Sequence, residues 1–150
     1  MSTKWSHLPN AHLIDWVLES VKTDPEAWKA AGDAAGDAAW EYGRMTAWDA
    51  ARAAAWEYGR MTALDAAYAA ADAAREYGRM AARAAAWAAG DAAWDAIMAL
   101  IADDTAAQYL HMEPDELNIW TILSEKPAAR LLIPANQIWQ REHARAVVHE

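Results

Sequence analysis

The stretch that decides the fold is AWEYGRMTAWDAARAA (39–54), which is followed directly by AWEYGRMTALDAAYAA (55–70). The two copies differ at two positions, and a third, more divergent copy, REYGRMAARAAAW, begins at Arg75. Alanine has the highest helix propensity of the amino acids, and the chain contains 41 alanines and ten tryptophans. The sequence therefore predicts an all-α fold, an Ala/Trp-rich helical array or bundle built from an internal 16-residue repeat.

Two regions with more ordinary aliphatic content flank the repeat helices, which we assign to residues 25–104 of a single domain (1–150). Residues 1–24 predict an N-terminal helix, because apolar residues recur there at helical spacing: Ile14, Val17, Leu18 and Val21. Asp24 is placed to cap the next helix, with Pro25 at its first position. Residues 105–150 carry three of the five prolines and predict a cap of short helices.

The middle region cannot form one straight helix within a compact domain. Residues 26–103 would span about 117 Å as a single helix, whereas a compact domain of this length has a radius of gyration of about 15 Å. The segment must turn back on itself or assemble into a long oligomeric bundle. We predict helix ends at Gly43 and Gly59, because each follows a Glu-Tyr pair where a glycine can end a helix. The alternative is an intact helix in which glycine allows close packing.

Tryptophan and arginine alternate every four residues along the first two copies: Trp40, Arg44, Trp48, Arg52, Trp56 and Arg60. This spacing places each guanidinium one helical turn from an indole, as a cation–π contact requires. Each of these arginines also follows an acid by three residues, as Arg52 follows Asp49 and Arg60 follows Glu57. Two interpretations therefore stay open, a structural one with solvated salt bridges and core tryptophans, and a binding one.

The binding interpretation is a pocket for a flat anionic ligand, in which rings stack on the ligand and arginine neutralises its charge. Its candidate residues are Arg75, Arg79, Arg83, Trp87, Tyr77, Tyr58, Arg60 and Trp56. We expect no catalytic residue, metal ligand or cofactor, because the sequence lacks HExxH, GxSxG, P-loop and GxGxxG motifs. The carboxylate pairs Asp33/Asp37 and Asp91/Asp95 are interpreted as solvated helix faces.

The formal net charge of −9 argues against duplex nucleic acid and anionic membranes as partners, since both attract basic proteins. The first ten residues lack the apolar core of a signal peptide, and no run reaches the length of a transmembrane helix. The chain has no cysteine, which is compatible with a reducing compartment. We therefore predict a cytoplasmic protein.

Three phrases, GDAAGDAAW (32–40), AAGDAAWDA (88–96) and ALIADDTAAQYLHMEPDELNIWTILSEKPAARLLIPA (99–135), resemble uncharacterised Ala/Trp-rich helical proteins of phages and bacteria. The resemblance covers about residues 30–135. It implies an all-helical fold and a phage or mobile-element origin, in which case the cytoplasm is that of the host cell. It assigns no catalytic or binding residue.

Two functions are compatible with these features. The first is a non-enzymatic binding protein that sequesters a small anionic, nucleotide-like ligand, which in the phage setting implied by the resemblance would counter a host defence signal. The alternative is an acidic protein–protein interaction module, such as an immunity protein or inhibitor, that covers a basic partner surface. We also expect a homo-oligomer, because symmetric pairing of two chains would bury exposed indoles.

Overall fold

The computed structural model describes residues 5–35, 38–57, 59–60, 63, 65–66, 68–70, 72, 83–123 and 126–148. Its elements are α1 (Ala11–Thr23), α2 (Pro25–Ala35), α3 (Ala38–Glu57), α5 (Arg83–Ala102), α6 (Ala107–Leu110), α7 (Pro114–Leu123), the 3₁₀ helix η2 (Pro127–Leu132) and α8 (Ile133–Val148). No strand occurs among these residues, so the predicted all-α class is confirmed. None of their helices has the length and apolar character needed to cross a bilayer.

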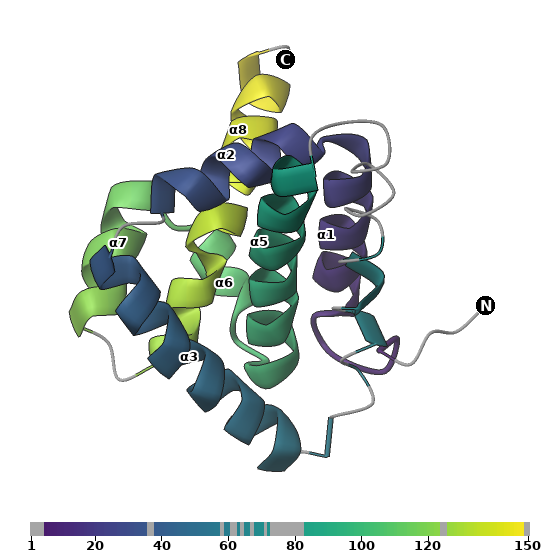
Figure 1. Cartoon of the computed structure of the whole chain (residues 1–150), viewed down its shortest axis with the longest axis vertical. Helices are drawn as coiled ribbons and strands as arrows, with labels where there is room; N and C mark the ends of the chain where they lie inside the picture. The colour runs from purple at the N-terminus through teal and green to yellow at the C-terminus, as the bar shows by residue number, and fades with distance from the viewer. Residues whose placement is uncertain are drawn as a thin grey trace.

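Helix α5 is the centre of the fold, and it packs against α1, α2, α3, α8 and η2 (Figure 1). Between Ala89 and Ala102, nearly every α5 residue is buried, the exceptions being Asp91 and the partly buried Trp94. The last two turns contribute the large apolar side chains of the core, namely Ile97, Met98, Leu100 and Ile101. A helix that is apolar on all sides is typical of a core element, and the neighbouring helices surround this one.

The carboxylate pair on α5 differs from its predicted solvated face. Asp91 is exposed, but only 1% of Asp95 is accessible to solvent. Four residues along a helix correspond to a rotation of about 40° beyond a full turn, which carries Asp95 beneath the neighbouring elements. No group of three side chains suited to holding a metal ion occurs among the described residues.

The N-terminal helix and the start of the next helix follow the sequence prediction. Ile14, Val17 and Val21 of α1 are fully buried. Asp24 Oδ1 accepts a hydrogen bond from the Ala27 backbone N–H at 3.2 Å, so Asp24 caps α2, and Pro25 is its first residue. Trp28 of α2 is completely buried, and its indole N–H donates to the Ser20 hydroxyl at 2.9 Å. Trp28 thus acts as the core tryptophan that the structural interpretation expects.

The predicted helix end at Gly43 is wrong, because α3 continues through it from Ala38 to Glu57. Ala47, Ala51 and Ala55 form one fully buried face of α3, which packs against η2 and α5. Small side chains at this spacing allow neighbouring backbones to approach closely, and this packing offsets the roughly 1 kcal/mol that glycine costs inside a helix.

The predicted helix end at Gly59 is confirmed. Its φ of 68° is left-handed, and its N–H donates to the Trp56 carbonyl at 3.1 Å. The Arg60 N–H donates to the Ala55 carbonyl at 2.8 Å, which completes a Schellman motif. The segment AWEYGRMTA (39–47, 55–63) therefore continues a helix in its first copy and ends one in its second. The sequence repeat is not confirmed as a structural repeat.

The C-terminal region contains three short helices, as predicted, and also the 16-residue α8. Two amides of α8 attach it to the end of α6. The buried Asn136 donates to the carbonyls of Tyr109 (2.8 Å) and Met112 (2.9 Å), and Gln140 donates to the Leu110 carbonyl at 2.8 Å. These bonds satisfy carbonyls that the end of a helix leaves without an intrahelical donor.

We expect Gly59→Ala to lower the free energy of unfolding by about 1–2 kcal/mol, because an L side chain is disfavoured at positive φ. Apart from the adjoining residues of the chain, no atom lies within 4 Å of the place that a Cβ would occupy, so the cost comes from the backbone conformation and not from a clash. Gly59→Asn is the matched control and should lose less, because asparagine tolerates this conformation. Urea unfolding measures both variants. A neutral or stabilising Gly59→Ala would contradict the helix end.

Candidate functional site

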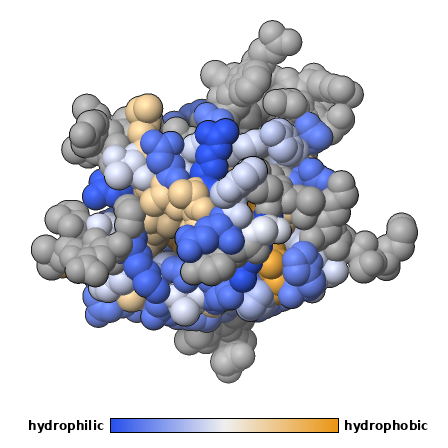
Figure 2. Space-filling model, turned by 90° about the horizontal axis from the view of Figure 1, so that it is seen from below, coloured by the Kyte–Doolittle hydropathy of each residue, from blue (hydrophilic) through white to orange (hydrophobic). Residues whose placement is uncertain are grey.

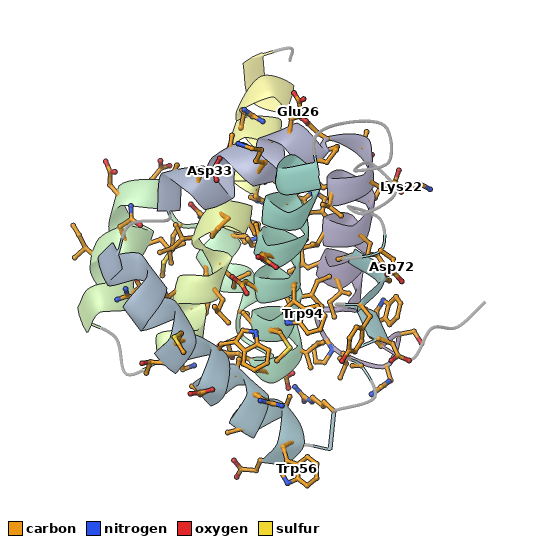
Figure 3. All side chains as sticks on the ribbon, in the orientation of Figure 1. Lys22, Glu26, Asp33, Trp56, Asp72 and Trp94 are labelled. Carbon is orange, nitrogen blue, oxygen red and sulfur yellow. The ribbon has the colours of Figure 1, made fainter. Side chains whose placement is uncertain are left out.

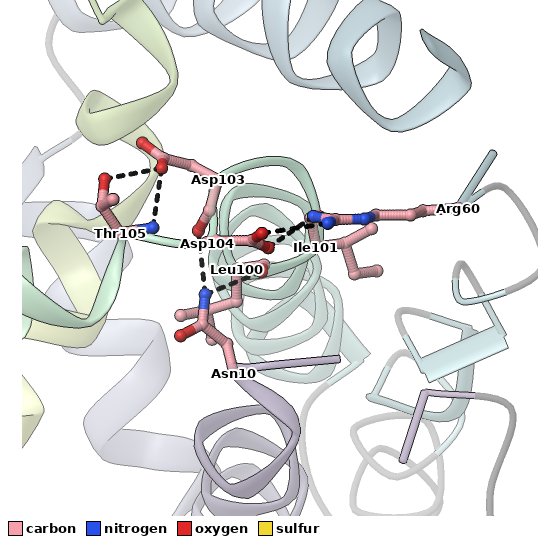
Figure 4. A network of polar contacts seen from close by, with 7 residues as sticks. All are labelled: Asn10, Arg60, Leu100, Ile101, Asp103, Asp104 and Thr105. Atoms are coloured by element: carbon pink, nitrogen blue, oxygen red, sulfur yellow. Dashed lines mark hydrogen bonds and ion pairs between the residues drawn. The ribbon is translucent and has the colours of Figure 1, made fainter. Parts of the chain in front are cut away.

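Arg60 connects the end of α3 to the carboxyl end of α5 (Figure 4). Its guanidinium donates to the Ile101 carbonyl at 3.0 Å and to both carboxylate oxygens of Asp104, at 2.6 Å and 3.0 Å. The Arg60 side chain is only 16% exposed, whereas that of Asp104 is 47% exposed. A bidentate, charge-assisted pair of this kind is among the stronger polar contacts in proteins. The Arg60 charge is therefore already matched by a carboxylate.

Other polar residues close the same end of α5. The buried Asn10 side chain donates to the carbonyls of Leu100 (3.1 Å) and Asp103 (2.8 Å). Asp103 accepts hydrogen bonds from the backbone N–H and the hydroxyl of Thr105, at 2.9 Å and 2.7 Å, and from the Tyr109 hydroxyl at 3.2 Å. These bonds form a turn that leads the chain from α5 into α6.

Two pKa values in this network are shifted. Burial alone would raise the pKa of Asp103, but the hydrogen bonds from Thr105 and the charge of Lys126 outweigh it and hold the pKa below its usual value. Burial, together with the adjacent Asp103 carboxylate, raises the pKa of Tyr109 to about 12. Both shifts favour an ionised Asp103 and a protonated Tyr109, which are the states in which Tyr109 donates a hydrogen bond to Asp103.

The outward face of α3 carries Arg52 and Trp56 of the tryptophan–arginine row. Met45, Asp49, Arg52 and Trp56 lie within a sector of about 60° around the helix axis. Met45 is 68% exposed and Trp56 is 73% exposed, and Figure 3 shows Trp56 pointing away from the fold at the end of α3. The Arg52 guanidinium lies 5.0 Å from the centroid of the Trp48 ring, a cation–π contact at the predicted spacing.

The predicted salt bridges of this row differ from those that form. Both Asp49 and Arg52 are described, and no ion pair joins them. Arg60 pairs with Asp104, 44 residues later, and not with Glu57 three residues earlier. Helical spacing alone predicted local partners, but the turn at Gly59 directs Arg60 towards α5. The sequence offered no signal for the Asp104 pairing.

The structure describes two side chains of the predicted ligand pocket. Arg60 contacts the end of α5, and Trp56 extends into solvent (Figures 3 and 4). Arg83 and Trp87 belong to the first turns of α5, but their side chains lie outside the described residues. Tyr58, Arg75, Tyr77 and Arg79 also lie outside them.

Helix α7 carries an acidic surface that the sequence analysis missed. Glu113, which precedes the helix, and Asp115 and Glu116 in its first turn are all exposed. No ion pair involves these three side chains in the part of the chain that the structure describes. Ile119 follows one turn later and is 60% exposed. The phrase EPDELNI (113–119) was the available signal, but acids at the start of a helix also interact favourably with its dipole.

A further group of side chains holds α1, α2 and α8 together. The rings of Trp16 and Trp139 meet edge to face, with centroids 4.9 Å apart, and the Trp16 ring is 5.9 Å from that of Trp28. The Trp16 indole N–H donates to Glu142 at 2.9 Å. His143 stacks on Trp139 with centroids 4.0 Å apart. This cluster joins elements distant in sequence, so its contacts are those of packing.

Comparisons with protein-family models, curated proteins and solved structures found no match for this chain. The resemblance to Ala/Trp-rich helical proteins therefore stays a prediction, and the function is inferred from the described surfaces.

We expect Arg60→Ala to lower the free energy of unfolding by about 2 kcal/mol, because it removes the hydrogen bonds to Asp104 and the Ile101 carbonyl. Arg60→Lys should recover only part of this, since an ammonium lacks the planar fork that contacts both Asp104 oxygens. Arg52→Ala is the control and should change stability by less than about 0.5 kcal/mol. Equal losses for Arg60→Ala and Arg52→Ala in chemical denaturation would show that the α5 contact adds no stability.

The raised pKa of Tyr109 predicts a loss of stability at alkaline pH. The unfolded chain ionises this phenol near its ordinary pKa of 10, whereas the folded chain holds the proton until about 12. Stability from this group is therefore complete below pH 10 and decreases as the pH rises towards 12. Tyr109→Phe should make this decrease shallower in urea unfolding. Parallel stability curves for the two proteins would contradict the assignment.

Proposed function

We propose that this protein is a non-enzymatic, acidic protein–protein interaction module that covers a basic surface of its partner. The observation that carries the proposal is the α7 surface, where three exposed carboxylates without ion pairs among the described residues adjoin an exposed isoleucine. Protein interfaces combine apolar area that is buried on binding with a polar rim, and Ile119 among these carboxylates offers both. We name this set, consisting of Glu113, Asp115, Glu116 and Ile119, the α7 surface.

The distribution of ion pairs supports this choice of surface. The net charge is −9, and several basic side chains are already matched with acids within the chain. These pairs are Lys29–Asp33, Arg60–Asp104, Lys126–Asp103 and Arg141–Asp24. The α7 carboxylates have no such pairing among the described residues, so they contribute uncompensated negative charge. A basic partner would be attracted to this charge over several ångströms and would associate faster.

The two chemistries of the α7 surface have separate roles in this proposal. The carboxylates steer the partner and select a basic surface, whereas Ile119 supplies apolar area that is buried on binding. Trp120, the next residue, packs its ring against Tyr109 with centroids 4.9 Å apart, which fixes α7 on the fold. The surface is thus presented on a helix with a packed inner side.

A small anionic ligand is the second candidate. The supporting observation is an aromatic pair in which the exposed Tyr68 ring meets the Trp94 ring edge to face, with centroids 4.8 Å apart. Rings of this kind stack on nucleobases, and three of the predicted pocket residues, Arg75, Arg79 and Arg83, follow in the sequence. The already paired Arg60 makes this the weaker of the two candidates.

The test is affinity capture from host-cell extract on the immobilised protein, followed by identification of the captured protein and measurement of its binding. We expect one basic partner whose association rate falls about tenfold in Glu113→Gln/Glu116→Gln and decreases with added salt. Glu19→Gln/Glu57→Gln removes the same charge from exposed positions on α1 and α3, outside both proposed contact surfaces, and is the matched control. Ile119→Ser should increase the dissociation rate without a large change in stability.

Equal effects of the α7 charge variant and this control would contradict the α7 surface, because net charge alone would then explain the binding. Native mass spectrometry of the purified protein tests the second candidate. A bound small anionic molecule, without a protein partner, would favour ligand sequestration over the interaction module.

A further inference from the structure

Four of the exposed residues of α3 follow the spacing of a coiled-coil seam. Met45, Asp49, Arg52 and Trp56 are separated by four, three and four residues, which is the alternation of a and d positions in a heptad. The opposite side of α3 is already occupied, because Ala47, Ala51 and Ala55 are fully buried in the fold. The helix therefore has one face that holds it to its own chain and a second face with seam spacing that remains at the surface.

The seam is complementary to a second copy of itself that runs in the opposite direction. The spacing reads the same in both directions, with an apolar residue at each end and opposite charges in the middle. When a second α3 is laid antiparallel, with its axis of rotation between Ala50 and Ala51, Met45 faces Trp56 of the second copy. Asp49 then faces Arg52, and the two-fold rotation produces each contact twice.

We propose that the chain forms a two-fold symmetric dimer in which α3 pairs antiparallel with α3 of a second copy, through Met45–Trp56 and Asp49–Arg52 contacts. In antiparallel coiled coils an a position of one helix packs against a d position of the other, and this register satisfies that rule along the seam. Residue i contacts residue j while j contacts i, as an isologous interface requires.

The contacts and the exposure of these side chains within one chain support a second copy as the occupant of the seam. Asp49 and Arg52 lie three residues apart and make no ion pair with each other. Arg52 instead lies over the Trp48 ring, which holds its guanidinium at the surface. Both ends of the seam expose more than half of a large apolar side chain, at Met45 and Trp56. The charged pair thus has its complement in the other copy.

Charge also favours a second copy of the chain over a basic partner as the occupant of this face. The seam contains one acid and one base, so it is neutral although the chain has a net charge of −9. A strongly basic surface would meet Arg52 with like charge, whereas a reversed α3 meets it with Asp49. Figure 2 shows the molecule from below, where mostly hydrophilic residues surround a central group of moderately hydrophobic ones.

The size of the seam sets the expected affinity. About three turns of one helix bury less surface than the roughly 1,200 Å² of a stable protein–protein interface, so we expect dissociation in the micromolar range. This proposal uses α3 and does not rest on the function assigned to the α7 surface. Loss of the dimer would leave that surface unchanged in each chain.

Charge reversal tests the register. We expect sedimentation equilibrium across the micromolar range to show a monomer–dimer equilibrium for the unmodified protein. Arg52→Asp and Asp49→Arg should each weaken the dimer at least about tenfold, because two like-charged contacts then form across the axis. The double variant Asp49→Arg/Arg52→Asp should restore it, because it exchanges the charges without changing the pairing. Lys22→Asp, on the exposed side of α1, changes the charge as Arg52→Asp does and is the matched control.

Mixing the two single variants gives a second, independent readout. Each alone should be largely monomeric, but together they should form a heterodimer, in which both Asp residues of one chain face both Arg residues of the other. Circular dichroism confirms that each variant is folded. An unmodified protein that stays monomeric throughout the range, or a dimer that neither single reversal weakens, would overturn the proposal. A double variant that fails to restore dimerisation would overturn the register.

Discussion

The contact between Arg60 and the carboxyl end of α5 joins two segments 44 residues apart, and it resolves an electrostatic conflict. A helix ends with unpaired carbonyls and partial negative charge, yet α5 is followed directly by Asp103 and Asp104. Arg60 binds a carbonyl and a carboxylate at this end at once. Asn10 and Thr105 supply further donors. The central helix can therefore end in an acidic turn that leads into α6.

This contact also explains how one sequence has two conformations. The nine residues AWEYGRMTA are identical at 39–47 and 55–63, so local propensity is the same in both copies. In the first copy the helix continues, because a buried alanine face packs against η2 and α5. In the second copy Gly59 adopts a left-handed conformation, and the next residue reaches α5. Tertiary contacts, and not the repeat itself, distinguish the two.

The predictable parts of the fold are those in which side chains carry a distinct local pattern. The apolar spacing of α1 and the Asp24–Pro25 start of α2 needed no knowledge of the rest of the chain, and both are confirmed. Alanine-rich helices carry much less information, because alanine fits a buried or an exposed face equally well. The burial of Asp95 and the exposure of Trp56 therefore depended on which helices lie nearby. The candidate surfaces could not be predicted from the sequence for the same reason, because packing decides the partner and the orientation of each side chain.

The two proposed surfaces would reinforce each other through valency. A two-fold dimer presents two copies of the α7 surface, so a partner with two basic sites could bind both at a high effective concentration. Salt would act differently on the two contacts. It screens the attraction between α7 and a basic partner, but it also screens the repulsion between two chains that each carry a net charge of −9. In the α3 seam salt also screens the two Asp49–Arg52 contacts, so the opposing effects leave the dimer less sensitive to salt than the contact with a basic partner. Ionic strength therefore separates self-association from partner binding even when both occur in one sample.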